Sequence, residues 1–512
     1  MLIKEIEDEV QKCVEASSDE LGRYLTAGKQ LSPGEVILRE KPLAVGPAVF
    51  NSNLLCYGCL RIIPNLPLLD LKFPCKICET AIFCSSSCED RRGLHTTREC
   101  EAFTRWGSLK GLSWTEFREI LFPLRLWLLQ EAEESWSEIM RLEAHLDVRR
   151  TTKVWKDRQE TVVDVLKRVG LAPKDSDEVL QRICGIIDVN SFELRSPGTL
   201  DSSPLRGLYP RAALMTHDCR GNTHLTVDDD FNLTVYASLP IDKGSPILFN
   251  YTSSLLGTWE RRVFLQEGKY FNCTCAMCQD PQELGAHLSS ILCPRCRKEF
   301  LGVPRVNPFG RERNWICRSC QKTFSGKLVR STLDLAQGKI IKCDQSSAKE
   351  LETLIKDLTR TFHPRHSLLM NLKQKLLGIY REEIANPRAR KQILERMLEL
   401  FKEFVEVLEI VEPGISRLKG IMMYEMHLPM IILANRDYTS REISSDELGH
   451  RLEQAAGYLK KSLSMLLLEP ATNPEGLLAK RALQEYKTLR QNLEDIRSLP
   501  QEKSISSCKK KS

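Results

Sequence analysis

The residues of this chain best suited to chemistry are cysteines set in closely spaced pairs. Nineteen cysteines occur among its 512 residues. Between residues 56 and 100, seven of them and one histidine form four pairs. Zinc takes thiolate and imidazole ligands in tetrahedral sets of four, so these pairs predict two closed, structural zinc sites. The pairs are Cys56 and Cys59, Cys75 and Cys78, Cys84 and Cys88, and His95 and Cys100.

A second cysteine-dense region covers residues 273–320. The pairs Cys293/Cys296 and Cys317/Cys320 have the spacing of a zinc ribbon, which closes one site with four thiolates. Upstream of them, a group of three thiolates needs a fourth ligand, and Cys219 is the nearest candidate in a comparable context. The three thiolates are those of Cys273, Cys275 and Cys278. With them and Cys219 the chain has sixteen ligands and is expected to hold about four zinc ions.

The other cysteines have simpler interpretations. The chain does not begin with the apolar run of a signal peptide, so we expect an intracellular protein whose thiols stay reduced. Cys13, Cys184, Cys343 and Cys508 are then buried apolar residues or exposed free thiols.

Composition indicates an ordinary globular protein of two to four packed units. Apolar residues make up 42% and charged residues 28% of the chain. The 74 basic and 68 acidic residues leave a formal charge of +6. Spread over the whole chain, this charge gives no nucleic-acid footprint, and the Lys509–Lys511 run is interpreted as a solvated tail. No stretch approaches the 18 apolar residues of a membrane span.

The elements that must position these cysteines follow from hydrophobic spacing and capping signals. We expect a short helix over 3–14, strands over 23–49, mostly helix over 113–188, short strands and turns over 189–270, and only helices beyond about 346. Helix starts are indicated at four places by capping or Asn-Pro signals. These are Ser113 with Glu116, Ser347 with Glu350, Ser444 with Glu447, and Asn473-Pro474.

The cysteine pattern of residues 56–100 resembles a MYND finger, a protein-interaction module. That resemblance implies interleaved sites, with Cys56, Cys59, Cys84 and Cys88 on one ion and Cys75, Cys78, His95 and Cys100 on the other. It also implies a partner for the finger: a proline-containing peptide or a corepressor such as a histone deacetylase complex.

Other segments resemble a SET domain of the SMYD family, in which a MYND finger interrupts the SET fold. Gly22–Ala27 and Ser32–Ala44 resemble the opening strands of the family's SET domain, and Pro246–Tyr251 resembles its closing motif. Met215–Asn222 follows the family's N-H-S-C-x-P-N pattern, whose cysteine completes a post-SET zinc site. His363-Pro364-x-His366 and Glu412–Arg417 are similar to its C-terminal helical domain. The resemblance covers roughly residues 18–495.

This resemblance implies an α+β fold with a β-rich SET domain and an all-α, TPR-like C-terminal domain. The expected units are an N-terminal helix at 1–17, the first SET part at 18–50, the MYND finger at 56–100, a helical SET insertion at 101–188, the second SET part at 189–272, the post-SET segment and zinc ribbon at 273–325, and the C-terminal helices at 346–498.

The chemistry implied by the family is methyl transfer from S-adenosylmethionine to a lysine amine by in-line displacement. Orientation matters most in such a step, and a desolvated channel must also lower the lysine pKa. By the resemblance, Tyr251 is the catalytic tyrosine, and Phe192 and Tyr270 line the substrate channel. The implied cofactor-binding residues are Gly22, Arg23, Asn190, Thr216, His217 and Phe271.

Several of these residues have a second interpretation. Phe192 and Phe271 are also suited to core packing, His217 to a satisfied interior histidine, and Asn190 to a turn. Tyr251 is the catalytic group or a tyrosine that ties the SET core together.

Three departures from the family pattern weaken the catalytic expectation and resemble its insect-type, SmydA-like branch. Tyr24 replaces a glycine, Thr216 an asparagine, and Lys269 the second channel tyrosine. Two functions follow. One is a protein-lysine methyltransferase, acting on histone or other proteins, with weakened activity in transcriptional regulation in nucleus and cytoplasm. The other is a non-catalytic SET/MYND scaffold for corepressor-type partners.

Overall fold

The computed structural model describes residues 12–48, 53–64, 73–105, 112–198, 202–302, 314–384 and 390–498. None of the helices in these ranges is both long enough and apolar enough to cross a bilayer. Cys508 and the Lys509–Lys511 run lie outside the described residues.

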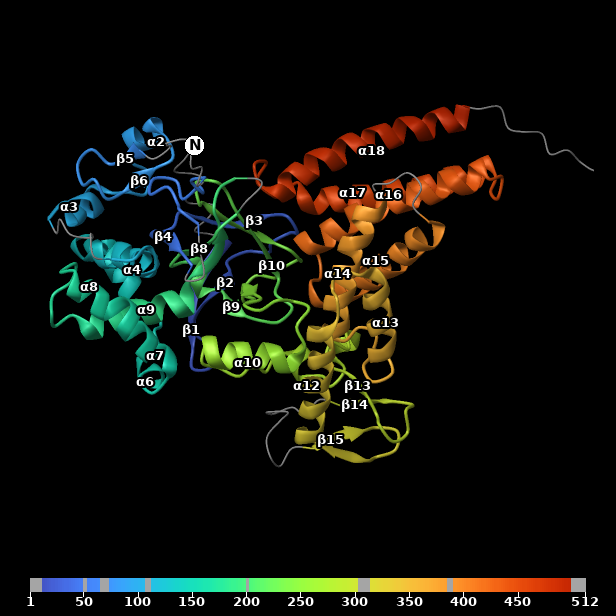
Figure 1. Ribbon diagram of the computed structural model, residues 1–512, viewed down its shortest axis with the longest axis horizontal. Helices are drawn as coiled ribbons and strands as arrows, with labels where there is room; N and C mark the ends of the chain where they lie inside the picture. The colour runs from blue at the N-terminus through green and yellow to red at the C-terminus, as the bar shows by residue number, and fades with distance from the viewer. Residues whose placement is uncertain are drawn as a thin grey trace, which may run out of the picture.

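Small sheets packed around one core make up the part of the chain that is expected to be a SET domain (Figure 1). One is the antiparallel pair β1-β2, and two are three-stranded antiparallel sheets with the orders β10-β11-β3 and β4-β8-β7. The fourth is the parallel pair β12-β9. Their bounds are β1 Cys13–Ser18, β2 Gly22–Ala27, β3 Val36–Glu40, β4 Ala44–Pro47, β7 Phe192–Arg195, β8 Pro204–Leu208, β9 Thr216–His217, β10 Thr223–Val227, β11 Leu233–Ala237 and β12 Leu248–Phe249.

Alternation of buried and half-exposed residues sets the register of these strands. In β11, Leu233, Val235 and Ala237 face the core, and Leu38 lies opposite Val235 in β3. Since side chains alternate along a strand, this register puts one apolar row against the core.

The N-terminal helix expected over residues 3–14 ends earlier than predicted. The helix expected over 3–14 does not reach Cys13, because Cys13 to Ser18 form β1 and pair with β2 along their whole length. Residues 1–11 lie outside the described residues. Strand pairing with β2 therefore outweighs the local amphipathic pattern at Cys13 and Val14.

The cysteine-rich finger has little regular structure of its own. It contains β5 Phe73–Pro74, β6 Ile82–Phe83, α2 Ser86–Arg91 and α3 Thr97–Arg105. In Figure 1 it lies beside the helical insertion at the end of the molecule opposite the C-terminal helices. A segment with so few packed elements depends on its metal sites for stability.

A helical insertion joins the finger to β7. A capping box at Ser113 and Glu116 starts its first helix, as predicted. Its helices are α4 Trp114–Trp127, α5 Glu133–Met140, α6 Leu146–Arg149, α7 Lys153–Arg158, α8 Asp164–Arg168 and α9 Asp177–Asn190, with short turns η2 Leu128–Glu131 and η3 Gln159–Val163.

The segment after β12 contains a helix where strands and turns were expected. Helix α10 Thr258–Gly268 has Gly257 as its N-cap residue, and the Gly257 backbone N–H donates to the Glu260 carboxylate. Because glycine has no side chain to cap a helix, the sequence carries only half of a start signal here. The post-SET turn α11 Ala276–Gln279 and the ribbon strands β13 Ile291–Leu292, β14 Phe300–Gly302, β15 Asn314–Cys317 and β16 Thr323–Ser325 follow.

After β16 the described residues are helical apart from short connections, and the helices begin earlier than expected, with α12 at Gly326. Starts at Ser347, Ser444 and Pro474 agree with the predicted signals. The helices are α12 Gly326–Lys342, α13 Ala348–Leu358, α14 Ser367–Ile384, α15 Lys391–Val411, α16 Arg417–Thr439, α17 Ser445–Leu466 and α18 Pro474–Ser498.

The Glu412–Arg417 motif docks these helices on the SET domain. Gly414 has φ +78°, and a Cβ there would lie 2.0 Å from the Ser238 carbonyl oxygen, so only glycine allows this approach. Arg417 binds the Glu469 carboxylate at 2.7 Å and the Leu225 carbonyl at 2.8 Å, and His224 of β10 lies 2.9 Å from Glu469. These buried contacts form one wall of the cleft described below.

Candidate active site and zinc centres

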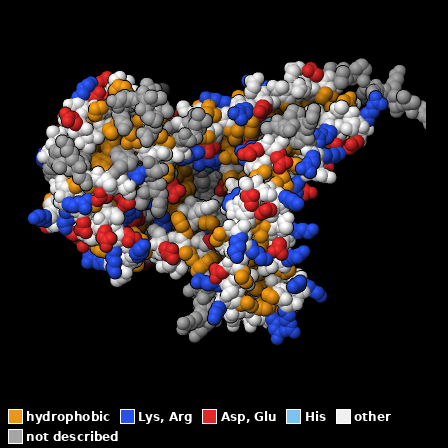
Figure 2. Space-filling view, viewed as in Figure 1, with side chains coloured by type: hydrophobic (Ala, Val, Ile, Leu, Met, Phe, Trp, Pro, Cys, Tyr) orange, Lys and Arg blue, Asp and Glu red, His pale blue; other side chains and the backbone are white. Residues whose placement is uncertain are grey.

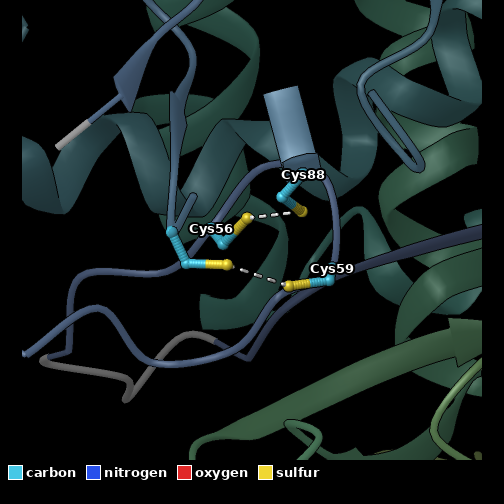
Figure 3. A group of neighbouring side chains, drawn as sticks. Cys56, Cys59 and Cys88 are labelled. Atoms are coloured by element: carbon cyan, nitrogen blue, oxygen red, sulfur yellow. Dashed lines mark hydrogen bonds between the residues drawn. The ribbon is translucent and has the colours of Figure 1, made fainter. Parts of the chain in front are cut away.

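Four sets of metal-ligand side chains converge in the described part of the chain, and within each set the ligand atoms lie within 4.8 Å of one another. Two sulfur atoms bound to one tetrahedral zinc at about 2.3 Å are roughly 3.8 Å apart. In the first set the Cys56–Cys88 and Cys59–Cys84 sulfur distances are 3.4 and 3.8 Å. Figure 3 shows Cys56, Cys59 and Cys88 facing a common space.

The second set combines three sulfur atoms and one imidazole nitrogen. Cys75 and Cys100 are 3.7 Å apart, and Cys78 lies 3.6 Å from His95 Nε2. The finger therefore has the interleaved arrangement that the MYND resemblance implied, because pairs one and three converge and pairs two and four converge.

A buried relay connects the second set to the SET domain. His95 Nδ1 lies 3.0 Å from the Glu99 carboxylate, which Arg125 binds at 2.8 Å. Arg125 also donates to the carbonyls of Val45 in β4 and Tyr57. Burial opposes ionisation of Glu99, but Arg125 outweighs it and lowers the pKa of that carboxyl group. A carboxylate on Nδ1 fixes the tautomer that presents Nε2 to zinc.

The remaining two sets lie after the SET core. Cys219 is 3.8 Å from Cys273 and 3.5 Å from Cys278, so it supplies the missing fourth ligand beside Cys275. In the ribbon, Cys293 lies 3.7 Å from Cys320 and Cys296 lies 3.6 Å from Cys317. All four sets thus have the donor chemistry and the spacing that zinc requires.

Tyr251 lies where the SET core meets a large cleft. The cleft has a volume of about 1180 Å³ and is bounded by the insertion, the SET strands and the start of α16. The parallel pair β12-β9 sets His217 opposite Phe249, and the backbone N–H of Tyr251 then donates to His217 Nδ1 at 3.1 Å. The Tyr251 hydroxyl donates to the Met215 carbonyl. Both ends of the tyrosine are therefore fixed.

An aromatic row runs from the cleft into the core through Tyr251. Phe192 lies 5.9 Å from Phe249, which is 6.1 Å from Tyr251. Tyr251 lies 5.1 Å from His217, and His217 lies 5.7 Å from Phe271. Phe192 and Tyr251 line the cleft, whereas His217 and Phe271 lie behind Tyr251. The row joins the expected substrate side to the expected cofactor side.

His217 adds no charge to this row. Burial lowers the pKa of its imidazole to about 4, so the ring is neutral at neutral pH. With Nδ1 accepting the Tyr251 N–H, the ring acts mainly as a positioning group for Tyr251.

Two more of the sequence-predicted cofactor residues meet at one short segment. The Arg23 guanidinium donates to the Arg141 carbonyl, and the Asn190 amide donates to the Glu143 carbonyl at 2.8 Å. Gly22, next to Arg23, has φ +66°, and a Cβ there would meet no atom within 4 Å beyond its chain neighbours. The backbone at Gly22 is therefore open to a ligand. Thr216 lies on β9, where its N–H donates to Ile247 at 3.3 Å.

Lys269 occupies the space beside the Tyr251 ring. Its Nζ lies 5.7 Å from the ring centroid and donates to the Val189 and Asp188 carbonyls at 2.5 and 3.4 Å. These carbonyls belong to the last turn of α9, where a cation is favoured. Burial and the nearby charge of Arg206 together lower the pKa of Lys269 to about 8.

The Tyr270 side chain contacts the helical insertion. Its φ is +62°, its ring lies 5.2 Å from His145, and its hydroxyl accepts from Arg149 at 3.2 Å. Tyr270 lines the same cleft as Tyr251, but its hydroxyl is held by Arg149 on α6.

Sequence reasoning missed the charged cluster behind Lys269. Asp188 binds Arg149 at 2.8 Å and Arg158 at 2.7 Å, with Arg206 3.5 Å away. Burial raises the pKa of Asp188, but Arg158 and Arg149 outweigh burial and hold it below its ordinary value. Glu99 was missed as well, although its position four residues after His95 was a usable signal. The Asp188 cluster had no such local signal, because its members come from α6, α7, α9 and β8.

Comparisons with known proteins identify the fold. The SET domain-containing protein SmydA-8 (isoform B) of Drosophila melanogaster is 26% identical over 377 residues, 72% of this chain and 79% of that protein. Histone-lysine N-methyltransferase ASHR1 of Arabidopsis thaliana is 24% identical and covers 79% of this chain and 83% of its own length. The chain is therefore similar to SET-domain proteins of the SMYD type. Human histone-lysine N-methyltransferase SMYD3 is 23% identical over 67% of this chain and 80% of its own length.

No family model matches the chain. A solved structure of Rubisco LSMT bound to AdoMet covers 99% of this chain at 11% identity, but with a TM-score of only 0.23. The SMYD resemblance, its SmydA-like branch and the α+β fold are nevertheless confirmed by the curated relatives and the four cysteine sets.

Proposed function

We propose that the protein is a protein-lysine methyltransferase that uses S-adenosylmethionine and binds it more weakly than its relatives do. The observation that carries this proposal is the aromatic row, in which Tyr251 separates the cleft that holds Phe192 from the inner pair His217 and Phe271. Several relatives are named histone-lysine N-methyltransferases, so histone lysines are the first substrates to try.

The pKa of Lys269 indicates how burial at this site affects an amine. Burial beside Tyr251 lowers the pKa of this lysine to about 8, from an ordinary value near 10.4. A substrate lysine entering the same desolvated channel experiences the same penalty on its charged form. The channel therefore favours the neutral amine, which is the nucleophilic form.

The residues around Tyr251 fit the cofactor in kind. When bound, S-adenosylmethionine supplies the methyl group for the amine. Arg23, Asn190 and the open backbone of Gly22 would hold its polar end, and Phe271 its adenine ring. His217 stays neutral and so adds no repulsion toward a sulfonium. The task of Tyr251 is to orient the incoming amine from a fixed position.

Weak cofactor binding follows from three features of the same site. Tyr24 adds bulk next to Arg23, and Thr216 lacks the amide that its family position carries. Lys269 places a cation beside Tyr251. A sulfonium and an ammonium in one desolvated site repel each other more than in water.

A test is methyl transfer to purified histones and to a lysine peptide library, read by mass spectrometry. Wild type is expected to methylate lysine slowly, and Tyr251→Phe to lose at least about 100-fold, since it removes the hydroxyl but keeps the ring. Cofactor binding and zinc content of Tyr251→Phe serve as controls and should not change. Transfer that does not depend on the Tyr251 hydroxyl would contradict the assigned role.

The alternative is a scaffold that recruits corepressor-type partners through the finger, in nucleus and cytoplasm. The observation that favours it is Lys269, because a channel filled by its own amine leaves less room for a substrate lysine. Undetectable cofactor binding by wild type and by Lys269→Tyr would favour this second function. A finger-dependent pull-down of a proline-containing peptide would support it.

A further inference from the structure

The zinc ribbon has a larger net positive charge than the chain as a whole. Residues 293–330 contain ten Lys and Arg against two Asp and Glu, a formal charge of +8, whereas the entire chain carries +6. The rest of the chain is thus slightly acidic. Averaging the charge over all residues, which led to the expectation of no nucleic-acid contact, conceals this concentration.

The fold collects these charges around one centre. Five of the basic residues are one or two positions away from a cysteine of the ribbon set, whose sulfur atoms lie within 4.8 Å of one another. Lys327 follows at the start of α12. The ribbon cations, as we call the six, are all exposed: Arg295, Arg297, Lys298, Arg318, Lys322 and Lys327.

This unit lies at the edge of the molecule. Strands β14 and β15 occupy the lower end in Figure 1, away from the MYND finger and from α18. The space-filling view shows Lys and Arg side chains gathered at that lower end (Figure 2). A partner can therefore approach the ribbon without meeting the other domains.

Local carboxylates do not neutralise the ribbon cations. None of the six pairs with an acidic residue in the described part of the chain. Neighbouring cations on the C-terminal helices are paired, such as Lys339 with Asp357 and Lys373 with Glu403, each at 2.6 Å. A zinc ion bound by four thiolates carries a formal charge of about −2, which is too little to neutralise six positive side chains.

The kind of partner follows from what the surface has and what it lacks. Three of the six are arginines, whose planar fork matches phosphate oxygens. In the described part of the ribbon the aromatic side chains of the strands are withdrawn, since Trp315 is buried and Phe300 and Phe324 are half-buried, so these strands offer no exposed ring to a base. We propose that the ribbon cations bind the phosphate backbone of nucleic acid without reading its sequence.

The experiment uses the full-length, zinc-loaded chain and fluorescence anisotropy with two labelled probes, a DNA duplex and a single-stranded RNA. The ribbon variant replaces Arg295, Arg297, Lys298 and Arg318 by Gln. The matched control replaces four exposed lysines of α17 and α18 by Gln: Lys460, Lys461, Lys480 and Lys487.

We expect wild type and control to bind alike, and the ribbon variant to bind at least about 30-fold more weakly at moderate salt. Each duplex phosphate contact contributes about 0.9 to the slope of log affinity against log salt, so four lost contacts flatten that slope by about three to four. The two probes decide whether duplex or single strand is preferred.

Two further measurements keep the proposal falsifiable. Zinc content shows whether the ribbon variant is folded, and Lys322→Gln with Lys327→Gln, which leaves the turns between the cysteines intact, should weaken binding in the same direction. Equal affinities for the ribbon and control variants would overturn the proposal. So would equally tight binding to polyglutamate, which would instead assign the surface to an acidic protein.

Discussion

The amine of Lys269 lies 5.7 Å from the centroid of the Tyr251 ring. It is held there by the Val189 and Asp188 carbonyls at the end of α9. The lysine therefore places a titratable cation next to the proposed catalytic tyrosine. Several properties of the site depend on the charge of this one amine.

Cofactor affinity should rise with pH. The pKa of Lys269 is lowered to about 8, so its ammonium loses its charge as the pH rises through 8 and stops repelling a sulfonium. Stability should rise from about pH 8 to 10.4, because over that window the unfolded chain binds a proton that the folded chain does not. Calorimetry and thermal unfolding between pH 7 and 9 check both trends, and Lys269→Met should remove this contribution to each. A pH response that is the same in Lys269→Met would exclude Lys269 as its source.

Metal analysis should find close to four zinc ions per chain, because four sets of ligands converge. Replacing Cys75 by Ala should remove one ion and loosen the finger, since three ligands leave an incomplete shell. Replacing Cys343, which lies outside all four sets, should change nothing. Two ions or fewer in wild type would contradict the assignment.

Glu99→Gln should weaken the finger without touching a zinc ligand. The change breaks a buried pair with Arg125 and removes the carboxylate partner of His95, which we expect to cost about 3–5 kcal/mol of stability and 10–100-fold in zinc affinity at that site. Zinc competition and thermal unfolding measure the two effects. Glu101→Gln, an exposed residue of the same helix, is the control and should behave as wild type.

Gly414→Ala should loosen the docking of the C-terminal helices. The new methyl group would lie 2.0 Å from the Ser238 oxygen, at a backbone φ of +78° that disfavours alanine, which together cost at least about 1–3 kcal/mol. Limited proteolysis should then cut near the motif. Gly449→Ala in α17 has open space and should be neutral or stabilising by up to about 1 kcal/mol. Equal behaviour of the two variants would show that Gly414 is not a docking point.

Zinc ligands and helix starts could be predicted because their signals are local. Cys56 and Cys59 are three positions apart, as are Ser113 and Glu116, so residue type and spacing indicate what they do. Cys219 needed the family pattern, since its partners lie more than 50 residues away. Helix α10 was missed because Gly257 provides no capping side chain.

The environment of Lys269 could not be predicted, because it is set by residues far away in the chain. Its partner carbonyls belong to α9, about 80 residues earlier, and Arg206 comes from β8. The sequence indicates that a cation replaces a tyrosine at this position. Only the packing of α9 against the turn after α10 shows that the amine lies beside Tyr251, where burial lowers its pKa.

Calorimetric titration of S-adenosylmethionine into wild type, Lys269→Tyr and Tyr24→Gly tests the central claim most directly. Removing the cation or the bulk should each recover on the order of 1–3 kcal/mol, which is roughly 5- to 150-fold in affinity. We therefore predict weak binding by wild type and clearly tighter binding by both variants, with zinc content unchanged. Tight binding by wild type that neither substitution improves, or no binding by any of the three proteins, would contradict the account.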